Sequence, residues 1–326
     1  MKAHTLMTSA MLLAAIALSP AAAQAQATVW VSSEKDHAIA VVDATTLALQ
    51  ATVPTCKRPR HMQLAPGGKQ LLVACAESHA ADVIDIATRK SVKRVPLGDD
   101  PEAFDLSPDG KMLYVSNEDE GALGFVDFAS GKMVKQVAVG KEPEGVKTSP
   151  DGKLVYVTSE VANLVHVVDV ASAKVLHNIK VGKRPRRMAI TPDGAELWVT
   201  NELDASVSIV STKDHKVIHT LKFELPGARA ADITPVGIAL TKDGKRAFIG
   251  MGRANHVAFV DVAQRKVTNM VLAGKRVWNV ALDKAESRLY VVNGLSDDMT
   301  VIDVASAKPL KTVAVGRVPY QALVIE

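Results

Sequence analysis

Residues 107–117 read Ser-Pro-Asp-Gly-Lys-Met-Leu-Tyr-Val-Ser-Asn, and closely similar stretches occupy residues 149–159 and 191–201. The copies start 42 residues apart, so the chain contains an internal repeat. Each copy joins a turn to a run of alternating apolar and β-branched residues, which is typical of a β-strand. In the turn, the Asp109-Gly110 pair supplies the positive φ that a tight hairpin needs.

A second marker has the same period. An aspartate that follows valine or isoleucine recurs every 42 residues, except where one copy is degenerate and an insertion follows it. Ser211 takes the place of the missing aspartate. We expect the aspartate to end the third strand of each unit and to accept hydrogen bonds from turn amides. The six aspartates are Asp43, Asp85, Asp127, Asp169, Asp261 and Asp303.

Each repeat unit contains four short strand patterns, and units of this kind and length are typical of propeller blades. In one unit the expected strands are Ala103–Ser107, Met112–Asn117, Leu123–Asp127 and Val134–Val139. Near the start of the chain, Val29–Ser32 aligns with a second strand, whereas the final stretch, Tyr320–Ile325, aligns with a first strand. The sequence therefore predicts an all-β, seven-bladed β-propeller of four-stranded antiparallel blades. The C-terminal strand should join the N-terminal blade and close the ring.

The N-terminus has the composition of a secretory signal. Lys2 precedes an apolar stretch over residues 6–18, and small residues follow Pro20. We expect residues 1–25 to be a signal peptide and residues 26–326 to form one propeller domain, located in the periplasm. Lys and Arg total 39 against 35 Asp and Glu, with no basic run, which argues against nucleic acid as a partner. We expect a monomer with no membrane span in the mature chain.

The strand motifs at Leu113–Asn117, Val155–Ser159 and Leu197–Asn201 resemble the YVTN-type β-propeller repeat. The opening residues Thr28–Asp36, with Arg58-Pro59-Arg60 after them, are similar to a narrower group. These are exported propellers associated with pyrroloquinoline quinone (PQQ)-dependent catabolism. The resemblance implies an association with PQQ and with a periplasmic quinoprotein dehydrogenase. Propeller lactonases are more distant relatives by fold, and fold alone does not transfer function.

One repeat position lies at the head of each innermost strand, near the expected mouth of the central channel. Charged residues occupy it on one side of the ring, and Val236 and two aromatic residues occupy it on the other. Such a mouth could hold a part-apolar anionic ligand between a stacking wall and an arginine clamp. The alternative is a solvated rim of weak ion pairs. The candidate ligand-binding residues are Arg60, Glu102, Glu144, Arg186, Trp278 and Tyr320.

A ring of glutamates follows the second strands, at Glu34, Glu118, Glu160 and Glu202. We expect these carboxylates to pair with Arg58, Arg184, Arg187 and Arg276 as a belt between blades; a hard cation is the alternative partner. The same glutamate in many copies favours a structural role.

The two cysteines, Cys56 and Cys75, are predicted to form a disulfide, because an exported chain meets an oxidising compartment. Cys56 precedes an innermost strand and Cys75 ends the adjacent antiparallel strand, so the hairpin can bring them together. An insertion at Leu225–Thr234 is either a lid or a tolerated loop extension.

Three functions fit these observations. The first is a non-enzymatic periplasmic binding or accessory propeller that serves a quinoprotein oxidation system. The second is a lactonase-type hydrolase that uses rim carboxylates and a divalent metal, and the third is a protein-interaction scaffold. Three converging carboxylates would favour the hydrolase, whereas arginine-paired glutamates would favour the accessory protein.

Signatures of catalysis are scarce. The sequence contains no nucleophile-elbow motif and no haem-attachment motif, so we assign no catalytic residue and no metal ligand. Among the histidines, only His61 is expected at the mouth, because it directly follows Arg60.

Overall fold

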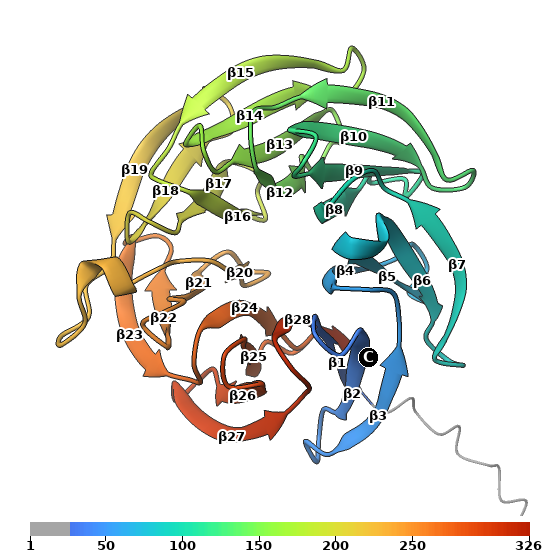
Figure 1. Cartoon of the computed structure of the whole chain (residues 1–326). Coiled ribbons are helices and arrows are strands. Elements are labelled where there is room, and N and C mark those ends of the chain that lie inside the picture. The colour runs from blue at the N-terminus through green and yellow to red at the C-terminus, as the bar shows by residue number, and fades with distance from the viewer. Residues whose placement is uncertain (1–26) are drawn as a thin grey trace, which may run out of the picture.

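The computed structural model describes residues 27–326, and the expected signal peptide lies outside them. Seven four-stranded antiparallel sheets form a closed ring (Figure 1), which confirms the predicted all-β, seven-bladed propeller. The C-terminal strand β28 (Pro319–Ile325) pairs with β1 (Thr28–Ser33), so the last strand completes the first blade, as expected. Within the described residues, no helix is long and apolar enough to cross a membrane.

Each blade consists of four strands that follow one another from the channel to the outer edge of the ring. The first blade has β28 innermost, followed by β1, β2 (Ala38–Asp43) and β3 (Leu49–Pro54). The second has β4 (Pro59–Leu64), β5 (Gln70–Cys75), β6 (Ala80–Asp85) and β7 (Lys90–Pro96). The third has β8 (Pro101–Leu106), β9 (Met112–Asn117), β10 (Ala122–Asp127) and β11 (Lys132–Ala138). The fourth has β12 (Pro143–Thr148), β13 (Leu154–Ser159), β14 (Leu164–Asp169) and β15 (Lys174–Lys180).

The remaining blades follow the same order. The fifth has β16 (Pro185–Ile190), β17 (Glu196–Asn201), β18 (Ser206–Ser211) and β19 (Lys216–Lys222). The sixth has β20 (Ile238–Leu240), β21 (Arg246–Gly250), β22 (His256–Asp261) and β23 (Lys266–Leu272). The seventh has β24 (Val277–Leu282), β25 (Arg288–Asn293), β26 (Asp298–Asp303) and β27 (Lys308–Ala314). Two short 3-10 helices, η1 (Ala76–Ser78) and η2 (Ala230–Asp232), lie in loops.

The repeated turn residues act as the sequence predicted. Gly110 has a φ of +68° in the turn between β8 and β9, which a residue with a side chain adopts only with strain. At the end of β10, the Asp127 carboxylate accepts a hydrogen bond from the Ser130 amide at 2.7 Å. Asp43, Asp85, Asp169 and Asp303 cap the equivalent turns of other blades.

The core lies between neighbouring blades. One cluster joins Val29 and Val42 of the first blade to Tyr290 and Val301 of the seventh, and all four are buried. Since each blade has two apolar faces, only a closed ring covers them all. The Leu225–Thr234 insertion is anchored at its end, because Ile233 is buried in the cluster between the fifth and sixth blades.

Candidate functional site

The innermost strands begin with a β-bulge in six of the seven blades. In β4, for example, the register shifts between Pro59 and Met62: these residues are three apart in β4, but their partners in β5, Cys75 and Val73, are only two apart. A bulge changes the direction in which side chains point, so two consecutive residues can point toward the channel, where a regular strand would direct only one of them there. The corresponding shifts in the other blades involve β8, β12, β16, β24 and β28.

Hydrogen bonds between blades hold these bulged segments. Ser32 Oγ donates to the Arg60 carbonyl at 2.8 Å, and Ser116 Oγ donates to the Glu144 carbonyl at 2.8 Å. Thr158 and Thr200, at the same repeat position, reach the carbonyls of Arg186 and Val236. A serine or threonine in one blade therefore fixes the head of the innermost strand in the next blade.

The structure brings the six candidate ligand-binding residues together at the channel mouth. Arg60 contacts Glu102, and Arg186 contacts Glu144 at 3.3 Å. Tyr320 donates to Glu144 Oε1 at 3.2 Å, and its ring centroid lies 5.8 Å from that of Trp278. The alternative of a solvated rim is wrong, because five of the six residues are buried and Trp278 is partly buried.

The aromatic pair is covered by arginines. The Arg60 guanidinium lies 4.4 Å from the Tyr320 ring centroid, and the Arg276 guanidinium lies 4.4 Å from that of Trp278. Gly294 permits this arrangement, because a Cβ at that position would meet the Trp278 ring at 2.1 Å. The stacking surfaces expected for a ligand are thus largely occupied by side chains of the protein.

The glutamate ring pairs with arginines at three of its four positions. Glu34 lies 3.4 Å from Arg58, Glu160 lies 2.7 Å from Arg184, and Glu202 lies 3.2 Å from Arg276. Arg187, which was expected to pair with the glutamate ring, does not do so. It lies 3.0 Å from Glu144, because the bulge in β16 turns it toward the channel and away from the ring.

Glu118 is the exception in the ring. Among the described residues it makes no ion pair; instead its carboxylate converges with those of Asp100 and Glu102, with one oxygen of each within 4.8 Å of the others. Burial raises the pKa of Glu118, and the charges of Glu144 and Asp100 raise it further. Arg58, which lies 3.3 Å from Asp100, neutralises part of this acidic group.

Two buried glutamates in the mouth have opposite pKa shifts. Burial opposes the ionisation of Glu144, but Arg186, Arg187 and Arg60 outweigh it and lower the pKa to about 2. Burial raises the pKa of Glu160 to about 7, against the effect of Arg186 and Arg184, and the charges of Glu144 and Glu202 contribute to the rise. The mouth therefore stabilises the charge of Glu144 far more than that of Glu160.

A cavity of about 370 Å³ lies within the channel, and apart from His61 and Arg187 its lining residues are not among those that the sequence singled out. Its polar lining residues occupy the third and fifth positions of the innermost strands, one and three residues beyond the predicted mouth position. The sequence singled out His61 only as the neighbour of Arg60; the signal that could have found the others is the run of polar residues at these two positions. The polar residues of the lining are His61, Gln63, Asp105, Lys147, Arg187, Asn279 and Gln321.

Fold and site together define a seven-bladed β-propeller with a charged, closed mouth above a polar channel cavity. A family model described as "Lactonase, 7-bladed beta-propeller" matches residues 146–324, so the chain belongs to that family. The sequence motifs alone had suggested a more distant relationship to propeller lactonases. A second model, "YNCE-like beta-propeller", matches residues 78–150. No curated protein matches the chain.

Solved structures share the architecture. Hydrazine synthase from Kuenenia stuttgartiensis is 25% identical, with 85% of this chain and 92% of that chain covered and a TM-score of 0.77. A functionally unknown protein from Desulfotomaculum acetoxidans is 16% identical, with coverages of 92% and 99% and a TM-score of 0.77. The dihydro-heme d1 dehydrogenase NirN is 15% identical, with coverages of 91% and 74% and a TM-score of 0.69. The last two likenesses show the fold alone.

Proposed function

We propose that this chain is a non-enzymatic binding propeller that holds a small organic anion in its central channel. The observation that carries the proposal is the 370 Å³ cavity, in which Lys147, Arg187 and His61 line one space. Concave sites with a few convergent polar groups are the usual form of small-molecule sites. Cationic side chains in such a site favour a ligand with a carboxylate or a similar group.

The mouth network supports binding over catalysis. Glu144, with a pKa of about 2, is a weak general base at neutral pH. Arg60 and Arg186 contact carboxylates of the protein and do not line the cavity, so neither is placed to clamp a ligand there. Lys147 and Arg187 also contact carboxylates, those of Asp105 and Glu144, but both line the cavity. The network is therefore suited to closing and shaping the channel.

The finer part of the proposal is that the protein is exported to the periplasm and assists a quinoprotein oxidation system. Its supports are the resemblance at Thr28–Asp36 and the disulfide between Cys56 and Cys75, a bond typical of oxidising compartments. PQQ is a planar quinone with three carboxylates, so it belongs to the class of ligand that the channel cations favour. A periplasmic quinoprotein dehydrogenase is the corresponding partner.

Thermal-shift and calorimetric measurements with PQQ, divalent cations and lactones test the proposal. A ligand at 100 times its dissociation constant should stabilise the fold by about 2.7 kcal/mol. Stabilisation by an organic anion, with no turnover, supports a binding protein. If no organic anion stabilises the protein, the proposal is wrong, and the protein-interaction scaffold becomes the better hypothesis.

The second candidate function is lactone hydrolysis. The family match over residues 146–324 favours it, as does the convergence of Asp100, Glu102 and Glu118, which offers the oxygen ligands of a hard cation. Against it, Arg58 and Arg60 contact this acidic group and would repel a cation. Lactone hydrolysis that is lost with EDTA and restored by a divalent cation would establish this function in place of the first.

A further inference from the structure

Within the channel cavity, the cationic groups are concentrated on neighbouring strands. Lys147 lies in β12 and Arg187 in β16, and both belong to the lining. Lys147 Nζ lies 3.1 Å from Asp105 Oδ2, and its side chain is 39% exposed, so the ammonium group keeps room for another acceptor. Gln63 donates to the same Asp105 carboxylate at 3.0 Å. This side of the cavity therefore presents cationic donors to a ligand, whereas the polar lining residues of the seventh and first blades, Asn279 and Gln321, are uncharged.

Apolar side chains of the first and seventh blades line the cavity beside the uncharged polar residues Asn279 and Gln321. Ala281, Leu282 and Leu323 line the same cavity, and Leu282 also lines a second cavity of about 440 Å³. The second cavity includes Leu64 and Leu240, at the ends of innermost strands where the Asp-Gly turns lie. The mouth at the other end is filled by buried side chains. Leu64, Leu240 and Leu282 thus form an apolar strip along this end of the channel. Charged residues also line the second cavity, namely Lys242, Asp283, Lys284, Glu286 and Glu326.

His61 lines the same cavity. Its ring packs edge-on against Phe104, with the centroids 4.9 Å apart. Burial lowers the pKa of His61 to about 3, the charges of Arg187 and Lys147 lower it further, and Glu144 acts in the opposite direction. The remaining carboxylate of the lining, Asp105, is held by Lys147, Gln63 and the Thr148 amide at 2.8 Å. His61 is thus neutral at pH 7 and faces two cations.

We infer that the cavity binds an amphipathic monocarboxylate, which enters from the face of the Asp-Gly turns, and that His61 gains a proton when it binds. This rests on the proposed function, because it names the ligand class of the same site. A carboxylate near Lys147 and Arg187 offsets the two charges that disfavour protonated His61, and it accepts a hydrogen bond from the imidazolium. These two effects have to outweigh burial, which is the largest cause of the low pKa. The apolar part of the ligand then lies against Leu282 and Leu323.

Isothermal titration calorimetry at pH 6 tests the ligand class with phenylacetate and its neutral isostere phenylacetamide. We expect phenylacetate to bind at least tenfold more tightly than the amide. Lys147→Met should weaken phenylacetate binding about tenfold, while the exposed control Lys153→Met should leave it unchanged. Equal affinities for acid and amide would overturn the carboxylate class.

The same titrations in buffers of different ionisation enthalpy measure proton uptake. We expect net uptake in the wild type and its loss in His61→Gln, with the exposed His219→Gln as the matched control. Phenylacetate binding without uptake would refute the role of His61 and leave the proposed function standing. If neither phenylacetate nor PQQ nor any other organic anion binds, the proposed function itself fails.

A separate variant tests the route by which the ligand enters the cavity. Leu282→Trp should slow phenylacetate association by narrowing the passage between the two cavities. Thermal unfolding and circular dichroism establish that each variant is folded before its binding is interpreted. An unchanged association rate in a folded Leu282→Trp protein would overturn entry from the face of the Asp-Gly turns.

Discussion

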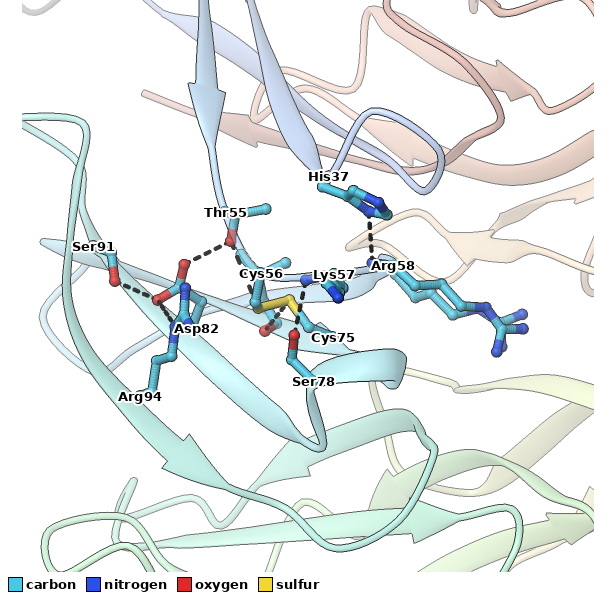
Figure 2. Close-up of a disulfide and its surroundings, with 12 residues drawn as sticks. His37, Thr55, Cys56, Lys57, Arg58, Cys75, Ser78, Asp82, Ser91 and Arg94 are labelled. Atoms are coloured by element: carbon cyan, nitrogen blue, oxygen red, sulfur yellow. Dashed lines mark hydrogen bonds and ion pairs between the residues drawn. A yellow bond between two sulfur atoms is a disulfide. The ribbon is translucent and has the colours of Figure 1, made fainter.

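Reduction of the single disulfide should lower the stability of the propeller by a predictable amount. Cys56 lies in the loop between β3 and β4, and Cys75 ends β5; their Cα atoms are 5.7 Å apart (Figure 2). The bridge closes a segment with a sequence separation of 19. For a loop of about 20 residues, the entropy of loop closure in the unfolded chain corresponds to about 3 kcal/mol.

That free energy converts to a shift in melting temperature. A domain of about 300 residues unfolds with an entropy of roughly 0.6 kcal/mol/K, at about 2.1 cal/mol/K per residue. The expected decrease in Tm is therefore about 5 °C. Both cysteines are buried, so reduction should require partial opening of this part of the second blade and should proceed slowly in the folded protein.

Differential scanning calorimetry of oxidised and reduced protein, with thiols counted in each sample, measures the shift. The Cys56→Ala/Cys75→Ala variant is the control, because its Tm should not respond to a reductant. Two free thiols in unreduced, denatured protein would refute the bridge. An unchanged Tm after complete reduction would refute the loop-closure argument.

The local consequence of reduction should be small. The loop keeps independent hydrogen bonds: Thr55 donates to Asp82 at 2.7 Å, and the Lys57 amide donates to Ser78 at 2.9 Å (Figure 2). Amide hydrogen exchange should therefore increase around Cys56 first, while Arg58 largely retains its contact with Glu34.

Other predictions concern the mouth. Glu144→Gln should reduce the free energy of unfolding in urea by about 3–5 kcal/mol, because it leaves the Arg187 guanidinium without its carboxylate and removes one of the carboxylates that Arg186 contacts. Glu160→Gln should reduce that free energy less at pH 7, and equal losses would contradict the opposite pKa shifts. The stability due to ionised Glu144 is fully present above its unfolded pKa near 4.5 and should be lost as the pH falls toward 2. The unfolding free energies of wild type and Glu144→Gln, measured in urea, should therefore converge over that interval. A constant difference between them would contradict this expectation. Ser116→Ala should lower the unfolding free energy by about 1–3 kcal/mol through loss of a buried hydrogen bond between blades, and an unchanged midpoint in urea would show that the bond contributes nothing. Gly294→Ala should displace the Trp278 ring and change its fluorescence; an identical emission spectrum would contradict the close packing.

The sequence by itself determined the architecture. Its signals are local: the Asp-Gly turns fix hairpins, alternation fixes strands, and a constant 42-residue period allows each blade to repeat the previous one. The match of Tyr320–Ile325 to a first strand was enough to predict ring closure, because the N-terminal blade lacked that strand. The cysteine pairing was readable for a related reason, since one hairpin brings the two positions together.

Only the tertiary structure decided how the channel is built. The β-bulges at the heads of the innermost strands interrupt the alternation of side chains, so they turn Arg187 toward Glu144 and place His61 in the cavity. The ion pairs could not be predicted from the sequence either, because a long side chain can reach acceptors in more than one blade. Arg186, for example, contacts both Glu144 and Glu160. The side chains at the channel mouth form a buried, closed network, not an open rim. Their burial is a property of the assembled ring, because it depends on contacts between blades that no single repeat contains.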